Sequence, residues 1–274
     1  MSLIFFLRFP VLVVSDLWFD GYYGPRRVAL EQALTAFNLF RPVRNVRIAE
    51  GAGEEVAVFT VESAAARPYC VIFPYRYQAA ARRYFREHPA VPTGLLLGRR
   101  SPSGQDGPLA LATDTGADLY RAGRAAGVLA GEGKVLFIYD DYPGGEERDA
   151  FRGGLRSGAY GGEPEYASSA FPLGSAAPLG AVVIRGPHEE AAQLDRTVPA
   201  LLFSWMDPAR CPRNIKVVFD DSPWTQAAEA ARILAGERDI KKIPSVVRIL
   251  NRNSIPKEQK ELLKAALASF PPGE

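Results

Sequence analysis

Apolar runs of strand length alternate with helix-length segments along this chain. Residues 134–139 form a strand-length run that is apolar after Lys134, a Pro-Gly-Gly turn follows at 143–145, and a segment of helical character covers 146–157. A strand can reach a parallel neighbour only through a crossover, and that crossover is usually a helix. The sequence therefore predicts an α/β fold with parallel sheets and helices on both of their faces.

The same alternation sets the expected elements. A first strand is predicted at residues 5–14 and a helix at 25–38, where Pro25 suits the first turn and Leu30, Leu34 and Phe37 recur on one face. A second long helix is predicted to end at Ala130, with Asp114 or Thr115 as its cap. The remaining strands are expected at 56–61, 69–73, 94–97, 109–112, 134–139, 166–170, 181–184, 200–203 and 215–219.

The amino-acid composition limits the classes of molecule that this protein is expected to bind. The 274 residues are 47% hydrophobic and 23% charged with a net charge of +2, as expected of a globular protein large enough for two domains. The interspersed charges form no basic stripe that would hold a phosphate backbone, so nucleic acid is not an expected partner. Cys70 and Cys211 have no metal-ligand spacing.

The N-terminal run at residues 3–14 is apolar enough to resemble the core of a signal peptide. Arg8 and Pro10 interrupt it, it lacks a basic leader, and it is too short to span a bilayer. It is interpreted as a buried strand, and no membrane span is expected. If the first three residues replace a removed native signal, the expected location is extracytoplasmic, either periplasmic or lipid-anchored; otherwise it is cytoplasmic.

Catalytic motifs are missing from the sequence. It has no GxxxxGK[ST] loop, no GxGxxG after the first strand and no GxSxG elbow. His88 and His188 are most simply surface or capping residues, and Asp140-Asp141 has no nucleophile or metal cluster beside it. We expect no enzyme, no catalytic residue, no metal and no cofactor.

Aromatic residues follow the apolar runs. Trp18 follows the first, Trp205 follows residues 198–203, and Trp224 follows 215–219. In open α/β sheets ligands bind beyond the carboxyl ends of the strands, and flat side chains stack well on planar rings. This pattern predicts a binding protein.

Two stretches resemble the type I periplasmic-binding-protein fold, which sugar-binding proteins share with the sensor domains of LacI-type repressors. Residues 111–158 are similar to that family's "tDn..aG..aa..L...gkv.vi.G.....eR..Gf..al" segment, and residues 216–254 are similar to its "tv.qd...lg..A...ll.G......p...l.p.lv.R.s" segment. The matching positions in the first stretch are Asp114, Gly123, Lys134, Glu147, Arg148 and Phe151.

The resemblance implies two Rossmann-like lobes with parallel central sheets, joined by a hinge of three crossovers. The crossings would fall near 112–114, near 208–213 and between 239 and 246. The first lobe would then comprise residues 1–112 plus about 210–243, and the second 113–209 plus about 244–274. A small molecule would bind in the cleft between the lobes.

Only some of the positions that bind ligand in this family have matching residues in this sequence. Arg148 matches the arginine that in sugar binders reaches the ligand from the second lobe, and Arg99 matches an arginine after the fourth strand. Asp220 matches a polar position that often contacts ligand. Gly98 replaces the acidic partner of Arg99, Gly186-Pro187 replaces an Asn-Asp pair, and Trp205 stands near an expected aspartate.

Two classes of ligand remain open. A nucleoside-like ligand would stack on Trp18 or Phe19 and on Tyr139 or Trp205, with Asp16 or Asp220 accepting ribose hydroxyls. An acidic sugar or amino acid would instead use arginines, namely Arg76, Arg99, Arg148 and Arg185. The predicted ligand-binding residues are Asp16, Trp18, Phe19, Tyr75, Arg99, Tyr139, Arg148, Trp205 and Asp220.

The leading hypothesis is a solute-binding protein that closes on a small polar ring compound, a sugar, sugar derivative or nucleoside, for an ABC importer or a chemoreceptor. An ABC permease would then be its partner. The alternative is the effector-binding domain of a LacI-like transcriptional regulator, which would carry a helix-turn-helix head before the first strand. A third hypothesis is an enzyme or structural protein on the same fold.

Overall fold

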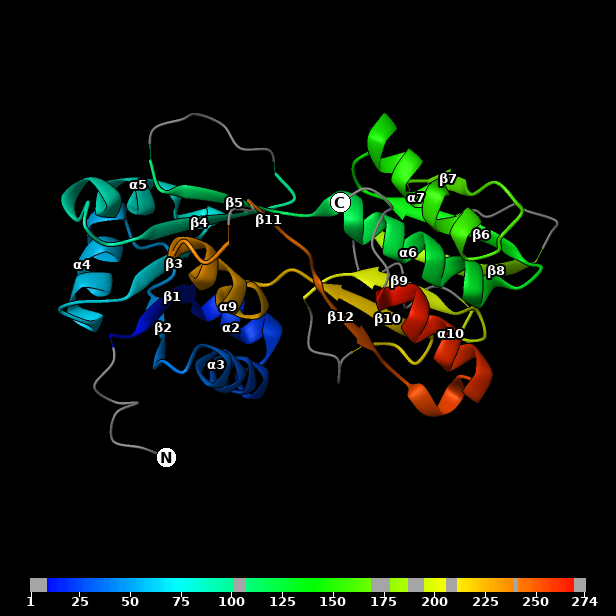
Figure 1. The fold of residues 1–274 in the computed structure, drawn as a ribbon, viewed down its shortest axis with the longest axis horizontal. Helices are drawn as coiled ribbons and strands as arrows, with labels where there is room; N and C mark the ends of the chain where they lie inside the picture. Colours follow the sequence, from blue (N-terminus) through cyan, green and yellow to red (C-terminus); the bar gives the residue numbers. More distant parts are fainter. Residues whose placement is uncertain are drawn as a thin grey trace. The chain divides into compact units, whose positions relative to one another are not determined.

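The chain folds into two compact units, which we call the first and second lobes (Figure 1). The computed structural model describes residues 9–100, 107–168, 178–186, 195–205, 211–238 and 241–268. The first lobe comprises Met1–Thr113 with Asp221–Ser245, and the second comprises Asp114–Asp220 with Val246–Glu274. The chain therefore passes between the lobes three times.

The sheet of the first lobe has six strands in the order β11-β5-β4-β3-β1-β2, all parallel. The strands are β1 (Val11–Asp16), β2 (Val43–Ile48), β3 (Cys70–Pro74), β4 (Thr93–Gly98), β5 (Leu109–Thr113) and β11 (Lys242–Ile243). The helices are α2 (Leu17–Tyr23), α3 (Pro25–Leu39), α4 (Glu54–Ala64), η1 (Tyr75–Tyr77), α5 (Gln78–Glu87) and α9 (Pro223–Leu234).

Helices pack on this sheet in two pairs, α3 with α9 and α4 with α5. The connection through α3 leads outward from β1 to the edge strand β2, and the connection through α4 leads back from β2 to β3. Because such crossovers are right-handed, opposite directions across the sheet put the two helix pairs on opposite faces.

The sheet of the second lobe has the order β12-β10-β9-β8-β6-β7, with β12 antiparallel to β10 and the other neighbours parallel. Its strands are β6 (Lys134–Tyr139), β7 (Glu165–Ala167), β8 (Leu179–Arg185), β9 (Ala200–Phe203), β10 (Ile215–Asp220) and β12 (Val246–Ile249). Its helices are α6 (Thr115–Ala130), α7 (Gly145–Ser157), η3 (Arg252–Ser254) and α10 (Lys257–Ala268). The predicted α/β class with two parallel-dominated sheets is confirmed.

One lobe boundary differs from the expected position. Residues 215–220 were expected in the first lobe, but β10 pairs with β9 and with β12 in the second sheet. The middle crossing therefore falls between Asp220 and Asp221. A buried strand such as β10 belongs to the sheet whose neighbouring strands satisfy its backbone groups.

One predicted strand is wrong. Residues 56–61 lie in α4, although Val and Phe in this run favour a strand on propensity. Two acidic residues, Glu54 and Glu55, occupy the first turn, where the helix dipole favours them. Ala57, Val58 and Val61 are the buried residues, at helical rather than alternating spacing.

A strand that the sequence analysis did not predict precedes this helix. In β2, with the sequence VRNVRI, the buried residues are Val43, Val46 and Ile48, and the two arginines between them are exposed. The sequence analysis looked for continuous apolar runs, and the two arginines interrupt this one, so the strand was not predicted. The first strand begins at Val11 rather than residue 5, and residues 5–8 lie outside the described ranges.

Three other expectations can be compared with the structure. Asp114 caps α6, because its Oδ1 accepts a hydrogen bond from the amide of Ala117 at 3.1 Å. Cys70 is buried and Cys211 half-buried, and neither forms a disulfide. Within the described ranges no helix has the length and apolar character needed to cross a membrane.

The second lobe depends on a very close crossing of α6 and α7. A Cβ added at Gly154 would lie 2.0 Å from the carbonyl oxygen of Tyr120, and one at Gly123 would lie 2.2 Å from that of Phe151. Both distances are far below van der Waals contact. Glycine is therefore required at these two positions by the approach of the two backbones.

This crossing predicts opposite effects for two neighbouring substitutions. Gly154→Ala should lower the free energy of unfolding of the second lobe by about 2–4 kcal/mol, because two helix backbones must separate. Gly153→Ala is the matched control, since its Cβ would meet only the ring of Tyr120 at 3.8 Å and alanine favours the helix by up to about 1 kcal/mol. Urea denaturation followed by circular dichroism measures both; equal effects would contradict the close crossing.

Candidate functional site

Asp16 ends β1 and ties together the strand ends of the first lobe. Its Oδ1 accepts a hydrogen bond from the amide of Phe19 at 2.8 Å, which caps α2. Its Oδ2 accepts one from the Tyr77 hydroxyl at 2.8 Å and lies 3.3 Å from Nη1 of Arg76. The side chain is fully buried. Both oxygens are thus occupied by protein groups rather than presented to solvent.

The partner Tyr77 is held as a hydrogen-bond donor. Burial, together with the hydrogen bond to Asp16 and the charge of that carboxylate, raises the pKa of Tyr77 above its ordinary value. The phenol therefore stays protonated at physiological pH and continues to donate to Asp16.

Trp18 and Tyr22 form an aromatic ledge beside this buried carboxylate. Their rings are stacked, with centroids 5.6 Å apart and an interplanar angle of 15°. Trp18 is 48% exposed, and the guanidinium carbon of Arg76 lies 6.0 Å from its ring centroid. The ledge presents a flat apolar surface with a cation at its side.

The other aromatic residues near β1 pack inward. Phe19 is buried and meets Trp224 edge-on with ring centroids 6.3 Å apart. Trp224 is itself buried in α9 and stacks on Tyr23 at 4.8 Å. These two side chains are core residues of the first lobe, and a run of aromatic residues in the sequence does not distinguish them from the exposed Trp18.

Arg99 follows β4 and meets Asp221 from the other segment of the first lobe. Its Nε lies 3.7 Å from Oδ2 of Asp221, and that oxygen also accepts a hydrogen bond from Thr113 at 3.3 Å. Gln226 in turn donates to the Thr113 hydroxyl at 3.2 Å. This network fixes the ends of β4, β5 and α9 together.

Tyr75 follows β3 and is half-buried. The guanidinium carbon of Arg100 lies 4.3 Å from the centroid of its ring. A cation at this distance is attracted to the face of the ring.

In the second lobe, Arg148 lies in the first turn of α7 beside an aromatic pair. Its Nη1 donates to the Tyr142 hydroxyl at 2.9 Å, and its guanidinium carbon lies 5.1 Å from that ring's centroid. Tyr142 meets Tyr139 edge-on at 5.1 Å. Among the described residues no carboxylate lies within 4.0 Å of the Arg148 guanidinium, and its buried Nε has no hydrogen-bond acceptor there.

The neighbouring cation Arg185 is paired. Its Nη1 lies 2.8 Å from Oε2 of Glu147, and the same oxygen accepts the amide of Gly144 at 3.2 Å. Glu147 thereby caps α7 and holds Arg185 at the end of β8. Glu147, the residue before Arg148, thus pairs with Arg185 and not with Arg148.

Asp220 ends β10 in a buried ion pair. Its Oδ2 lies 3.0 Å from Nη2 of Arg248 in β12, and only 3% of the Asp220 side chain and 11% of that of Arg248 are exposed. Trp205, half-buried, follows β9 next to Ser204, whose amide donates to the Phe219 carbonyl at 3.1 Å.

The residues predicted to bind ligand thus lie near the carboxyl ends of strands, some in the first lobe and the others in the second. Their contact with a ligand stays a prediction. The first lobe holds Asp16, Trp18, Phe19, Tyr75 and Arg99, and the second holds Tyr139, Arg148, Trp205 and Asp220.

Sequence reasoning placed Tyr77 among the aromatic residues near strand ends but did not predict that Tyr77 and Arg248 hold the two buried carboxylates. Arg248 stands alone among apolar residues in the run 246–250, and an isolated charge in a strand-like run is a signal of a buried partner. A second buried pair, Arg121 with Asp118, lies on α6 with the guanidinium carbon 5.7 Å from the ring of Phe219.

Two further features lie away from the predicted residues. Ligand atoms of Glu62, Glu87 and His88 come within 4.8 Å of one another, but His88 is hydrogen-bonded to Glu62 at 2.7 Å and Glu87 is ion-paired with Arg83 at 2.8 Å. These contacts account for the cluster as a surface ion-pair group. His188, the other histidine, lies outside the described residues.

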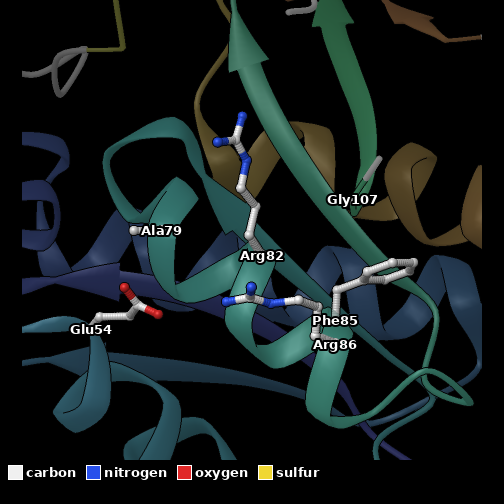
Figure 2. Close-up of a pocket in the computed structure, with 6 residues that line it drawn as sticks. All are labelled: Glu54, Ala79, Arg82, Phe85, Arg86 and Gly107. Atoms are coloured by element: carbon white, nitrogen blue, oxygen red, sulfur yellow. The ribbon is translucent and has the colours of Figure 1, made fainter. Parts of the chain in front are cut away.

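An open cavity of about 440 Å³ lies along α5, and Figure 2 shows the residues that line it. None of the predicted ligand-binding residues lines it. Arg82 and Arg86 project from one side of the helix, one turn apart, with Glu54 across from them. The lining residues are Glu54, Ala79, Arg82, Phe85, Arg86 and Gly107.

Comparison with known proteins identifies the fold. The sequence matches no protein-family model and no curated protein sequence. A transcriptional activator of the comK gene from Bacillus halodurans is similar in structure, with a TM-score of 0.64, 14% identity, and coverage of 96% of this chain and 100% of that one. The chain has the type I periplasmic-binding-protein fold.

Two further solved structures support this assignment. A LacI transcriptional regulator from a Rhodococcus species has a TM-score of 0.53 and 18% identity, covering 88% of this chain and 96% of that one. An ABC transporter solute-binding protein from Actinobacillus succinogenes, with bound D-allose, has a TM-score of 0.56 and 11% identity, covering 93% and 100%. Binding proteins and regulators therefore both share this architecture.

The buried pair of the second lobe yields a stability prediction. Asp220→Ala should lower the free energy of unfolding by about 3–5 kcal/mol, because it leaves the Arg248 guanidinium buried without its carboxylate. Asp141→Ala, on an exposed residue of the same lobe, should change it by less than about 0.5 kcal/mol. Replacing Arg248 as well, in Asp220→Ala/Arg248→Met, should restore part of the loss in urea denaturation. A negligible effect of Asp220→Ala would mean that the pair is not desolvated.

Proposed function

We propose that this protein is a solute-binding protein that recognises a small polar ring compound through the side chains at the carboxyl ends of its strands. The ligand class is a sugar, a sugar derivative or a nucleoside. The fold supports this proposal, since a protein of the same architecture holds D-allose. Fold alone does not fix function, so the argument depends on particular side chains.

Arg148 is the observation that carries the proposal. A half-buried guanidinium costs free energy unless its donors are satisfied, and within the described residues this one has a phenol hydroxyl as hydrogen-bond partner and no carboxylate. Its five donors in a planar fork suit ring oxygens, hydroxyls or a carboxylate. Tyr142 orients the side chain. An acceptor-rich ligand edge would complete its hydrogen bonds.

The aromatic ledge supplies the complementary surface. Trp18 is half exposed and stacked on Tyr22, so one ring face is backed by protein while the side chain remains accessible. A sugar ring's apolar face or a planar base packs on such a surface. Arg76, beside the ledge, offers donors to the edge of the same ligand.

The buried carboxylates have a positioning role in this proposal. Asp16 holds Tyr77 and Arg76, and Asp220 holds Arg248. Neither carboxylate has the exposure needed to accept ligand hydroxyls directly. Ligand recognition would then use guanidinium donors and aromatic faces more than free carboxylates.

In this role the protein would act outside the cytoplasm and deliver its solute to an ABC permease, or signal to a chemoreceptor. Recognition by both lobes would couple binding to closure, because the closed state is the one that makes all the contacts.

The second candidate is the effector-binding domain of a transcriptional regulator. The observation that favours it is the similarity to two regulators, with TM-scores of 0.64 and 0.53. In the native gene, the codons that precede the segment encoding β1 distinguish the two candidates. A signal peptide there would support transport, and a helix-turn-helix head would support regulation.

A thermal-shift screen against sugars, sugar acids, nucleosides and amino acids tests ligand binding. A ligand at about 100 times its dissociation constant should stabilise the folded protein by roughly 2.7 kcal/mol and raise Tm by several degrees. Arg148→Ala should weaken that ligand at least about tenfold in calorimetric titration, because a central anchor is lost.

Arg156→Ala is the matched control on the same helix. Arg156 is 74% exposed and 3.8 Å from Glu163, so its removal should leave the affinity within about twofold. Trp18→Ala should also weaken binding. If Arg148→Ala and Trp18→Ala both leave the affinity unchanged, the site assignment is wrong; if the screen and native mass spectrometry find no ligand, the solute-binding proposal itself fails.

A further inference from the structure

The open cavity along α5 is not part of the site proposed above, and we call it the α5 cavity. Its volume of about 440 Å³ falls within the roughly 300–1,000 Å³ of small-molecule sites. All of its described lining residues belong to the first lobe. The cavity is therefore large enough for a small organic molecule, and residues of a single lobe build it.

Two arginines of α5 line this cavity without a counter-ion. Arg82 and Arg86 are both exposed and stand one helical turn apart (Figure 2). Within the part of the chain that the structure describes, no carboxylate lies within 4.0 Å of either guanidinium. Like charges at this spacing repel one another on a helix. Two uncompensated positive charges are thus gathered at one wall of a cavity.

The neighbouring acidic residues are paired with other groups. Arg83, which lies between the two arginines in the sequence, is ion-paired with Glu87 at 2.8 Å and with Glu55 at 3.3 Å. The helix dipole favours a cation in the last turn, which accounts for Arg86. Arg82 lies a full turn earlier, where that effect has faded. The pair of unneutralised arginines therefore needs a further explanation.

The other walls of the cavity differ in chemistry. The stem of Arg82 lies beside Gly107, where an added Cβ would stand 3.8 Å from Cγ of the arginine. Phe85 is half-buried and supplies an apolar surface. Glu54 lies across from the two arginines, as Figure 2 shows, and brings a carboxylate to the far side. A ligand here would meet cations at one end and a hydrogen-bond acceptor at the other.

Charge identifies the group that the arginines suit. A guanidinium offers a planar fork of donors that fits phosphate or carboxylate oxygens. A phosphate group carries a charge of about −1.5 to −2 at pH 7 and has three acceptor oxygens, so it can compensate both arginines at once. A single carboxylate carries one charge and two oxygens, and it would leave one arginine unpaired.

The remaining walls indicate the rest of the ligand. The Glu54 carboxylate accepts hydrogen bonds, so it suits hydroxyl or amino groups, and Phe85 suits an apolar ring face. The same carboxylate would repel the additional acidic side chains of an acidic protein segment. A small phosphorylated molecule with hydroxyl groups therefore fits the cavity better than an acidic peptide.

We propose that the α5 cavity is a second binding site, which takes a small organic phosphate such as a phosphorylated sugar. Arg82 and Arg86 bind the phosphate, and Glu54 accepts hydrogen bonds from hydroxyl groups at the other end. Because both arginines are exposed and the cavity is open, the expected Kd is near about 1 mM. The proposal does not depend on the ligand of Arg148 or on the choice between transport and regulation.

NMR spectroscopy of the arginine side chains tests this proposal. Glucose 6-phosphate, titrated from about 0.1 to 20 mM, should shift the Nε–Hε signals of Arg82 and Arg86 with a Kd near about 1 mM. Glucose over the same range should leave both signals in place. Each signal is assigned by its loss in Arg82→Gln or Arg86→Gln, and circular dichroism confirms that the variants are folded.

Arg26→Gln is the matched control for the two α5 variants. Arg82→Gln and Arg86→Gln should each weaken glucose 6-phosphate at least about fivefold, because the phosphate loses one of its two guanidinium partners. Arg26 lies on α3 of the same lobe, is exposed, and has no ion-pair partner among the described residues. Its removal takes the same charge from another helix and should change the affinity by less than about 1.5-fold, since distant surface charges are screened.

Inorganic phosphate separates an organic phosphate site from a bare anion patch. It should bind at least about threefold more weakly than glucose 6-phosphate, because it has no sugar ring to contact Phe85 and no sugar hydroxyls for Glu54. Glu54→Gln should tighten inorganic phosphate, because a negative charge leaves the cavity, and should narrow the difference between the two probes.

Several results would overturn the proposal. Glucose 6-phosphate could shift neither arginine signal, or Arg26→Gln could weaken it as much as Arg82→Gln does. Equal affinities for inorganic phosphate and glucose 6-phosphate would show a bare anion patch only. A polyglutamate peptide that shifts the same signals at lower concentration would show that the surface recognises an acidic protein segment instead.

Discussion

The desolvated carboxylates at the ends of β1 and β10 are the constraint on which both halves of the candidate site depend. Asp16 is fully buried and connects β1, α2 and η1 through hydrogen bonds to Phe19 and Tyr77. Asp220 connects β10 to β12 through Arg248. A buried carboxylate is tolerated only when its oxygens are satisfied, so each one dictates the position of the segments that satisfy it. The buried Asp16 carboxylate also positions the aromatic ledge. It caps α2, the helix that carries Trp18 and Tyr22.

The sequence was sufficient to predict the architecture because the alternation of strands and helices leaves few alternatives. The helix over 25–38 and the cap at Asp114 follow from local rules, and they were predicted. The error at residues 56–61 arose because β-branched residues suit a strand and a buried helix face alike, and only the edge strand β2 beside them resolves the ambiguity. Leu30, Leu34 and Phe37 of α3 are exposed. Their exposure could not be predicted from periodicity, since periodicity finds the apolar face of a helix but does not say what covers it.

The residue types of the candidate site and their placement at strand ends could be predicted from the sequence. The hydrogen bonds and ion pairs between these residues could not. Asp16 and Tyr77 are 61 residues apart in the sequence, and no local pattern connects them. The sequence analysis gave Asp16 and Asp220 the role of accepting ligand hydroxyls, whereas the structure pairs both with protein donors. Arg148 shows the converse. An arginine in the first turn of a helix can also form an ordinary ion pair, but the adjacent Glu147 is paired with Arg185 and with a backbone amide. Among the described residues Arg148 thus has a phenol hydroxyl and no carboxylate as partner, and this supports its proposed role as a ligand anchor.

The departure at Gly98 has a backbone explanation that also bears on ligand chemistry. Gly98 has φ of +61°, next to a register shift in the pairing of β4 with β5, and a side chain at such a φ would be strained. Glycine adopts this backbone conformation without strain, so the conformation favours Gly98 over the acidic residue that the resemblance implies here. Asp221 supplies a carboxylate to Arg99 from the opposite segment of the lobe, and only 9% of its side chain is exposed. The Asp221 carboxylate at this strand end is paired with Arg99 and Thr113. In the function we propose, a ligand at this strand end would therefore meet hydrogen-bond donors more than acceptors. A ligand rich in acceptor oxygens fits this arrangement better than one recognised through its hydroxyl protons.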